Sequence, residues 1–215
     1  MRINKFIASS TGLSRRTADA AIANGRVTVN GLSPTSGQDV QPTDKVTLDS
    51  RVLVAPTKHT TILLNKPVGY VVSREGQGSK TIYELLPTEF HTLKPVGRLD
   101  KDSSGLLLMT DDGNLANELT HPSHQKAKIY QVELNKPLTE EDREAIVQGV
   151  TLTDGLSALQ LSGNGKRWTV TMSEGRNRQI RRTFSKRNYD VTSLHRTNFG
   201  PYKLDRLGIA KYTVL

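Results

Sequence analysis

The sequence predicts an α+β fold in two domains, a small one over residues 1–58 and a larger one over residues 60–215. Runs of strand-forming residues are joined by short turns, and helical segments are interspersed among them. This pattern is typical of a mixed, largely antiparallel central sheet and not of regular βαβ winding. The segment 49–59, which contains Pro56, indicates a strand end that runs into a linker between the domains.

The small domain begins with two predicted helices. Residues 3–7 place three apolar side chains at the spacing of one helix face. Ser14 can cap a second helix, which Gly25 can end in a left-handed conformation. An alternating strand over residues 26–29 then leads into Asn30-Gly31, a strong signal for a tight turn.

The larger domain mixes strands and helices. Strands are expected over residues 61–65, 70–73 and 129–134, in several segments up to residue 173, and from residue 188 to the end. Helices are expected over residues 80–86, 113–120 and 177–187, and over a further segment that Thr139 and Asp142 cap and Gly149 ends.

The chain of 215 residues has a net charge of +9 and contains no cysteine. A disulfide framework and a thiolate metal site are therefore excluded, which suits the cytoplasm. The sequence has neither the apolar run of a secretory signal nor one long enough for a membrane span, so no membrane partner is expected. The basic excess gathers in residues 1–58 and 174–215, which favours a polyanionic partner such as a nucleic acid.

Asp100 lies in a loop with glycine on both sides, directly before the apolar run Leu106–Met109. A carboxylate on a loop that is fixed to a buried strand is a frequent position for a catalytic group. Residue types alone nevertheless favour an ordinary surface loop over an active site.

Four segments resemble the motifs of the pseudouridine synthases, in the branch named for the small-subunit enzyme RsuA. Residues 97–113, GRLDKDSSGLLLMTDDG, resemble the motif of the catalytic aspartate. The other three segments are LNKPVG at 64–69, KIY at 128–130 and EGRNRQIRR at 174–182. Because the four motifs occur in the order of the family, the resemblance is highly specific.

The resemblance implies a role for each matching residue. Asp100 would be the catalytic carboxylate, with sugar-side chemistry favoured because positive charge develops on the ribose. Arg181 would form an ion pair with Asp100. Tyr130, also a catalytic residue, would stack on or hydrogen-bond near the target base and assist proton transfer on the sugar. Ile180 would pack against the uracil face. Further substrate-binding residues are expected at Lys66, Arg98, Arg176, Arg178 and Arg182.

Residues 14–31, SRRTADAAIANGRVTVNG, are similar to the small RNA-binding fold named after ribosomal protein S-four. Arg15 and Arg16 would then face RNA phosphates. The whole chain is thus expected to convert a uridine of ribosomal RNA to pseudouridine, without cofactor or metal and as a monomer. 23S RNA is the first expected target. The alternatives are 16S RNA, transfer RNA, and a non-catalytic RNA-binding factor for ribosome assembly.

Overall fold

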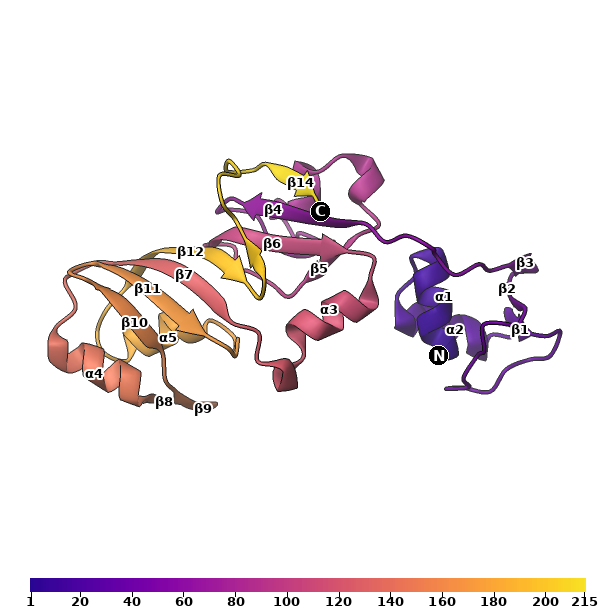
Figure 1. The fold of residues 1–215 in the computed structure, drawn as a ribbon, viewed down its shortest axis with the longest axis horizontal. Helices are drawn as coiled ribbons and strands as arrows, with labels where there is room; N and C mark the ends of the chain where they lie inside the picture. Colours follow the sequence, from indigo (N-terminus) through magenta and orange to yellow (C-terminus); the bar gives the residue numbers. More distant parts are fainter. The chain divides into compact units, whose positions relative to one another are not determined.

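The computed structural model describes residues 1–215, which divide into two compact units (Figure 1). Unit 1 comprises Met1–Thr60 with Asp111–Gly113, and unit 2 comprises Thr61–Thr110 with Asn114–Leu215. The α+β class predicted from the sequence is confirmed, because the helices occur together with largely antiparallel sheets and not in regular βαβ units. None of the helices combines the length and apolar composition needed to cross a bilayer.

Unit 1 combines two helices with a three-stranded antiparallel sheet, and they share one apolar core. Its elements are α1 (Ile3–Thr11), α2 (Arg15–Ala23), β1 (Val27–Val29), β2 (Val46–Leu48) and β3 (Arg51–Val52). The Ser14 hydroxyl accepts a hydrogen bond from the Thr17 N–H at 3.0 Å, which confirms the predicted cap of α2. Asn30 and Gly31 both have positive φ, as a tight two-residue turn requires.

Unit 2 is built on a nine-stranded sheet of order β10-β11-β7-β12-β6-β4-β14, with β13 beside β12 and β5 beside β6. The pairing of β12 with β6 is parallel and the other pairings are antiparallel. The strands are β4 (Thr61–Lys66), β5 (Lys94–Val96), β6 (Ser104–Thr110), β7 (Lys128–Leu134), β10 (Gln160–Asn164), β11 (Arg167–Met172), β12 (Val191–Phe199), β13 (Tyr202–Lys203) and β14 (Tyr212–Val214), and β8 (Val150–Leu152) pairs with β9 (Gly155–Ser157) in a separate hairpin.

Helices of unit 2 connect these strands. They are α3 (Gly113–Thr120), α4 (Glu140–Gln148) and α5 (Gln179–Ser185), with short 3-10 helices η1 (Ile82–Leu85), η2 (Thr88–Phe90) and η3 (Pro122–His124). The Thr139 hydroxyl caps α4 as predicted. The predicted strand over residues 70–73 is wrong: Val71 makes one isolated bridge to Thr81, and the chain then turns away through a glycine-containing loop.

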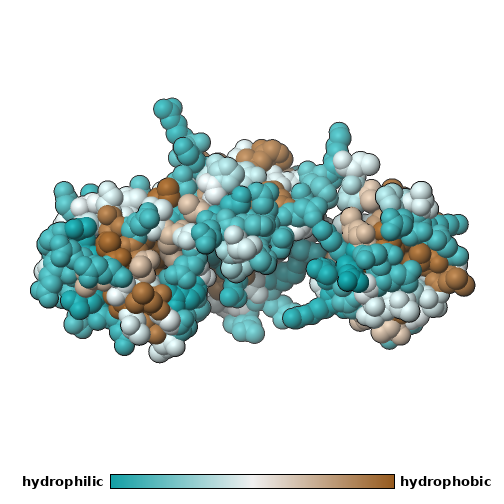
Figure 2. All heavy atoms as spheres, turned by 60° about the horizontal axis from the view of Figure 1, so that its bottom comes forward, coloured by the Kyte–Doolittle hydropathy of each residue, from teal (hydrophilic) through white to brown (hydrophobic).

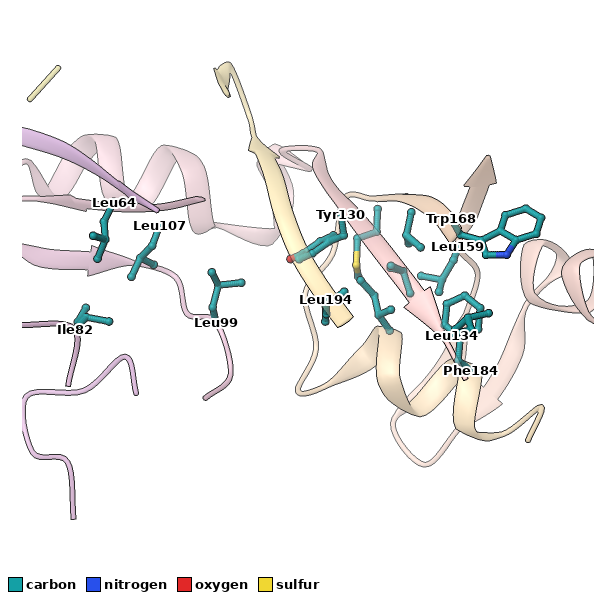
Figure 3. Close-up of a cluster of buried hydrophobic side chains, with 14 of the residues drawn as sticks. Leu64, Ile82, Leu99, Leu107, Tyr130, Leu134, Leu159, Trp168, Phe184 and Leu194 are labelled. Carbon is teal, nitrogen blue, oxygen red and sulfur yellow. The ribbon is translucent and has the colours of Figure 1, made fainter. Parts of the chain in front are cut away.

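Alternate residues of the central strands face two different cores. Leu64 and Leu107 lie in the larger core together with Phe184 of α5 (Figure 3). Their neighbours Leu63 and Leu106 lie in a smaller core on the other side. The period of two along each strand therefore buries both faces of the middle of the sheet. Hydrophilic side chains cover most of the face seen in Figure 2, where hydrophobic ones form small separate patches.

Gly105 allows β12 to approach β6 closely. It has φ +106°, and a side chain there would bring Cβ to 2.2 Å from the carbonyl oxygen of Arg196. A larger residue would push the two strands apart. The glycine after the Asp100 loop is thus required by the close packing of backbone behind that loop.

Lys66, at the end of β4, binds the backbone of the Asp100 loop. Its side chain is fully buried, and its ammonium donates to the carbonyl oxygens of Pro67 (3.0 Å), Asp100 (3.0 Å) and Ser103 (2.7 Å). The three N–H groups are all used, so the predicted substrate-binding role of Lys66 is wrong. Burial lowers the pKa of the ammonium to about 8, while the charges of Asp100 and Asp102 act in the opposite direction.

Replacing Lys66 by methionine should destabilise unit 2. The variant keeps the volume of the side chain but leaves three carbonyl oxygens without their donor, and the free energy of unfolding should fall by roughly 2–4 kcal/mol. Urea denaturation measures this change. Lys101→Met is the matched control, because the Lys101 ammonium bonds only the exposed Ser79 hydroxyl. Equal stability of the two variants would contradict the assigned role of Lys66.

The contribution of Lys66 to stability should also depend on pH. Its pKa is about 8 in the folded chain, below its ordinary value of 10.5, so the folded state loses this proton first as the pH rises. Below pH 8 both states are protonated and the cost of burying the charge is fully present. Between pH 8 and 10.5 that cost is relieved, and stability should rise. The stability difference between the parent and Lys66→Met should therefore widen from pH 7 to about pH 9.5; a constant or narrowing difference would be the contrary result.

Candidate active site

A pocket of about 960 Å³ lies in unit 2. Its walls come from the loop before β6, the segment around η3, the strands β7 and β12, and the loop that leads into α5. Six of the site residues predicted from the sequence line it: Arg98, Asp100, Tyr130, Arg176, Arg178 and Ile180. The volume is at the upper end of the range for small-molecule sites, so the pocket can accept an extruded nucleoside with part of its backbone.

Asp100 presents a partly exposed carboxylate to this pocket, with a side chain that is 32% exposed. Its ion-pair partner differs from the expected one. Nη1 of Arg178 lies 3.5 Å from the Asp100 carboxylate, whereas Arg181 pairs with Asp102 at 3.4 Å. Arg178 has φ +46° at the N-terminal end of α5, and from this position its guanidinium reaches both carboxylates of the loop.

Asp102 connects the two arginines. Its carboxylate accepts two hydrogen bonds from Arg178, at 2.9 and 3.0 Å, in bidentate geometry. The hydrogen bond from Arg178 lowers the pKa of the Asp102 carboxyl, with burial opposing and the charge of Arg181 assisting. Arg181 also donates to the carbonyl oxygens of Asp102 (2.8 Å) and Val191 (2.7 Å). Arg181 therefore fixes the loop and β12 in place and does not contact Asp100 directly.

Tyr130 and Ile180 supply the apolar part of the pocket. Tyr130 is 8% exposed and belongs to the large core, and no group of the chain hydrogen-bonds its hydroxyl. In Figure 3 the hydroxyl oxygen points away from Trp168 and Phe184. Ile180, on the first turn of α5, is 4% exposed and lines the same pocket. Both residues can contact a planar base, as the sequence predicted, and both also pack in the core.

Arg176 and Arg182 are already occupied by groups of the protein. Nη1 of Arg176 donates to the Asp154 side chain at 3.1 Å, and its Nη2 donates to the Leu156 carbonyl at 2.7 Å. Arg182 forms two further hydrogen bonds with the Asp154 carboxylate, at 3.0 and 2.7 Å. The two guanidinium groups hold the turn between β8 and β9 and stay 21% and 30% exposed, so their substrate-binding role remains a prediction.

Three other predicted residues are exposed. Arg98 lies at the pocket and has no ion pair or hydrogen bond within the chain. Arg15 and Arg16 lie at the start of α2 in unit 1, where Arg15 donates to Asn4 at 3.2 Å. These guanidinium groups can contact phosphates, because carboxylates of the chain do not neutralise them.

The sequence analysis missed Arg196, which lines the pocket and is 2% exposed. Its Nε donates to the Leu106 carbonyl at 2.8 Å, and its Nη2 is buried without a hydrogen-bond partner. The signal was present in the sequence, since in β12 Arg196 follows the buried Leu194 at an interval of two. A charged residue at a core-facing position of a strand indicates a site or a buried ion pair.

Known proteins similar to this chain agree with the motifs. The RNA pseudouridylate synthase family matches residues 60–186, and the S4 domain family matches residues 1–46. An uncharacterized RNA pseudouridine synthase of Aquifex aeolicus is 35% identical, over 100% of this chain and 90% of its own length. A ribosomal small subunit pseudouridine synthase A of Pasteurella multocida is also 35% identical, over 100% of this chain and 96% of its own.

A ribosomal large subunit pseudouridine synthase B of Pseudomonas aeruginosa is 36% identical over 93% of this chain, which spans only 55% of that relative's length. The crystal structure of a pseudouridylate synthase matches 100% of this chain and 96% of its own, with 32% identity and a TM-score of 0.72. Together with the four ordered motifs, these matches establish that the chain is a member of the RNA pseudouridylate synthase family that carries an S4 domain ahead of its catalytic domain.

Proposed function

We propose that this chain isomerises a specific uridine of ribosomal RNA to pseudouridine, with Asp100 as the catalytic carboxylate. The observation that carries the proposal is the placement of Asp100. Its carboxylate lies in the wall of a pocket that also presents Tyr130 and Ile180, on a loop that the buried Lys66 holds from behind. A carboxylate held in this way keeps its position while bonds at a bound nucleoside change.

The reaction breaks the bond between N1 of uracil and C1′ of ribose, turns the base, and joins C5 to C1′. Positive charge develops on the sugar when the first bond breaks, and a carboxylate stabilises that charge or bonds to C1′. Water must be excluded, or the base would be lost by hydrolysis. The apolar side chains of Met172, Ile180 and Leu194 in the pocket wall support this exclusion.

Arg178 takes the place that the sequence analysis gave to Arg181. Its guanidinium is shared between the carboxylates of Asp100 and Asp102, and it thereby orients the Asp100 carboxylate. Arg181 acts one step further away, by fixing the backbone at Asp102. Arg178 therefore orients the Asp100 carboxylate and Arg181 fixes the loop backbone, whereas Arg181 alone was expected to pair with Asp100.

Contacts to RNA would come from exposed cations on both units. Arg98 at the pocket can bind a phosphate next to the extruded uridine, and such contacts offset the cost of unstacking the base. Arg15 and Arg16 in the S4 domain would bind phosphates of the surrounding RNA. These contacts locate the RNA without reading its sequence.

RNA of the large ribosomal subunit is our first candidate substrate, because several relatives carry the name large subunit pseudouridine synthase B. RNA of the small subunit is the second candidate. It is favoured by the match to the small subunit synthase A over nearly the full length of both chains, whereas this chain spans about half of the large-subunit relatives. Incubation with transcripts of each RNA, followed by mapping of pseudouridine, separates the two.

Asp100→Asn should abolish isomerisation, with a loss of at least about a thousandfold in the single-turnover rate. The amide has the shape of the carboxylate but can neither bond to C1′ nor stabilise a positive sugar. RNA affinity should change little, because the phosphate contacts remain. The rate is measured by pseudouridine formed in a ribosomal transcript. Asp102→Asn serves as the comparison and should retain much more activity; a fully active Asp100→Asn protein would leave only an RNA-binding role for the chain.

Arg178→Gln should slow the single-turnover rate by about tenfold, because it removes the ion pair that orients Asp100. Arg143→Gln is the control: Arg143 forms a comparable exposed ion pair with Glu140 on α4, and its loss should leave the rate within about threefold. If Arg181→Gln slowed the reaction while Arg178→Gln did not, the partner of Asp100 in the working enzyme would be Arg181.

A further inference from the structure

Four side chains of β7 and β12 form one surface of the pocket. Tyr130 is paired with Arg196 across the two strands, and Lys128 is paired with Phe199. Residues three apart on a regular strand face opposite sides of the sheet. Here an extra residue, Thr197, shifts the register between Arg196 and Asn198, so that Phe199 pairs with Lys128, two residues from Tyr130 along β7. The bulge thus brings an arginine and a phenylalanine together beside Tyr130.

Two of these side chains contact the Phe199 ring directly. Cζ of Arg196 lies 4.9 Å from the centroid of the Phe199 ring, and Nζ of Lys128 lies 5.2 Å from the same centroid. The Lys128 ammonium also donates to three carbonyl oxygens, so its hydrogen-bonding capacity is used. Arg196 is therefore the cation of this surface with donors to spare.

The charge of Arg196 has no counter-ion in the chain. Its side chain is 98% buried, whereas that of Arg98 is exposed. No carboxylate lies within 4.0 Å of the Arg196 guanidinium. One carbonyl bond and one aromatic face are its polar contacts, and Nη2 has no partner. Arg176, Arg178 and Arg181 each have a carboxylate instead. A buried cation without a partner is costly, which indicates that a group from outside the chain completes it.

The surroundings of Arg196 fit a base better than a phosphate. Phosphates of an extruded nucleotide remain in the solvated RNA backbone, and the guanidinium groups that bind them are exposed, as Arg98 is. Arg196 instead lies among Tyr130, Phe199 and Leu194, where a planar heterocycle fits. A uracil ring offers two carbonyl oxygens to such a donor and a flat face to the aromatic side chains.

We propose that Arg196 donates hydrogen bonds from its terminal nitrogens to a carbonyl oxygen of the target uracil and stabilises the uracil anion during the isomerisation. This inference rests on the function proposed above. When the N1–C1′ bond breaks, its electron pair stays on uracil, and the negative charge spreads to O2 and O4. Asp100 stabilises or bonds C1′ at the same time. The Asp100 carboxylate thus stabilises the sugar while the Arg196 guanidinium stabilises the uracil anion in the same pocket.

The uracil anion must also remain bound in the pocket while it rotates. After rotation, an electron pair of the ring forms the C5–C1′ bond, and C1′ is released from Asp100. C5 then gives up its proton and N1 takes up a proton, so atoms and charge balance. A guanidinium can hold either carbonyl oxygen through successive N–H groups, which lets the base rotate without leaving the pocket.

The test compares Arg196→Met with the parent on ribosomal transcripts, in rate, RNA affinity and thermal stability. The rate of isomerisation under single-turnover conditions should fall by about a hundredfold, as when one donor to a developing anion is removed. RNA affinity should stay within about threefold, because phosphate contacts dominate it. The Tm should be unchanged or higher, because methionine replaces a buried cation that no carboxylate neutralises. Arg196→Lys, which keeps the charge but not the planar fork, should recover part of the rate.

Arg187→Met is the matched control. Arg187 forms an ion pair with Asp142 outside the pocket, so its loss should lower the Tm and leave the rate within about threefold. An unchanged rate in Arg196→Met, a loss confined to RNA affinity, or a lower Tm in both Arg196 variants would overturn the inference. If the parent itself modified neither ribosomal RNA, the proposed function would fail instead, and the two failures are thereby distinguished.

Discussion

The ammonium of Lys66, enclosed by three carbonyl oxygens, sets the conformation on which the pocket depends. Its acceptors include the backbone of Asp100 and Ser103, 34 and 37 residues further along the chain. A buried cation is tolerated there because backbone dipoles point at it and two carboxylates lie close by. The loop therefore cannot relax without leaving a charge in the core, and this constraint keeps the Asp100 carboxylate towards the pocket.

Cations around the pocket fall into two groups according to their partners. Arg176 and Arg182 share Asp154, and Arg178 and Arg181 share Asp102, so these four hold two turns in place. Arg98 and Arg196 have no carboxylate partner: Arg98 is exposed, whereas Arg196 is buried and contacts the Leu106 carbonyl and the Phe199 ring. The net charge of +9 already subtracts the carboxylates that pair with these arginines, and the exposed, unpaired arginines carry the contacts that a phosphate backbone can use.

Local signals allowed much of the fold to be predicted. Ser14 and Thr139 cap the helices that follow them, because a cap depends on residues within one turn. The strand predicted near Val71 does not form, because Val71 makes only one isolated bridge, to Thr81, and the segment around it is a loop. Similarly, the motif indicated Asp100 but not its ion-pair partner, since Arg178 at the N-terminal end of α5 brings its guanidinium closer to Asp100 than Arg181 does. Such pairings depend on tertiary geometry that residue spacing does not encode.

The bulge at Thr197 brings Phe199 into contact with Arg196, which the spacing of the two residues along the strand does not predict. Counting along β12 places Phe199 on the opposite face from Arg196, and only the register shift joins them beside Tyr130. A carboxylate for the sugar and a guanidinium for the base must occupy one pocket without neutralising each other. The chain meets this requirement by giving Asp100 a different partner, Arg178, which holds the carboxylate while Arg196 stays free for the uracil. Because Arg178 is the ion-pair partner of Asp100, the Arg196 guanidinium has no carboxylate partner and can bind the uracil of a bound nucleoside.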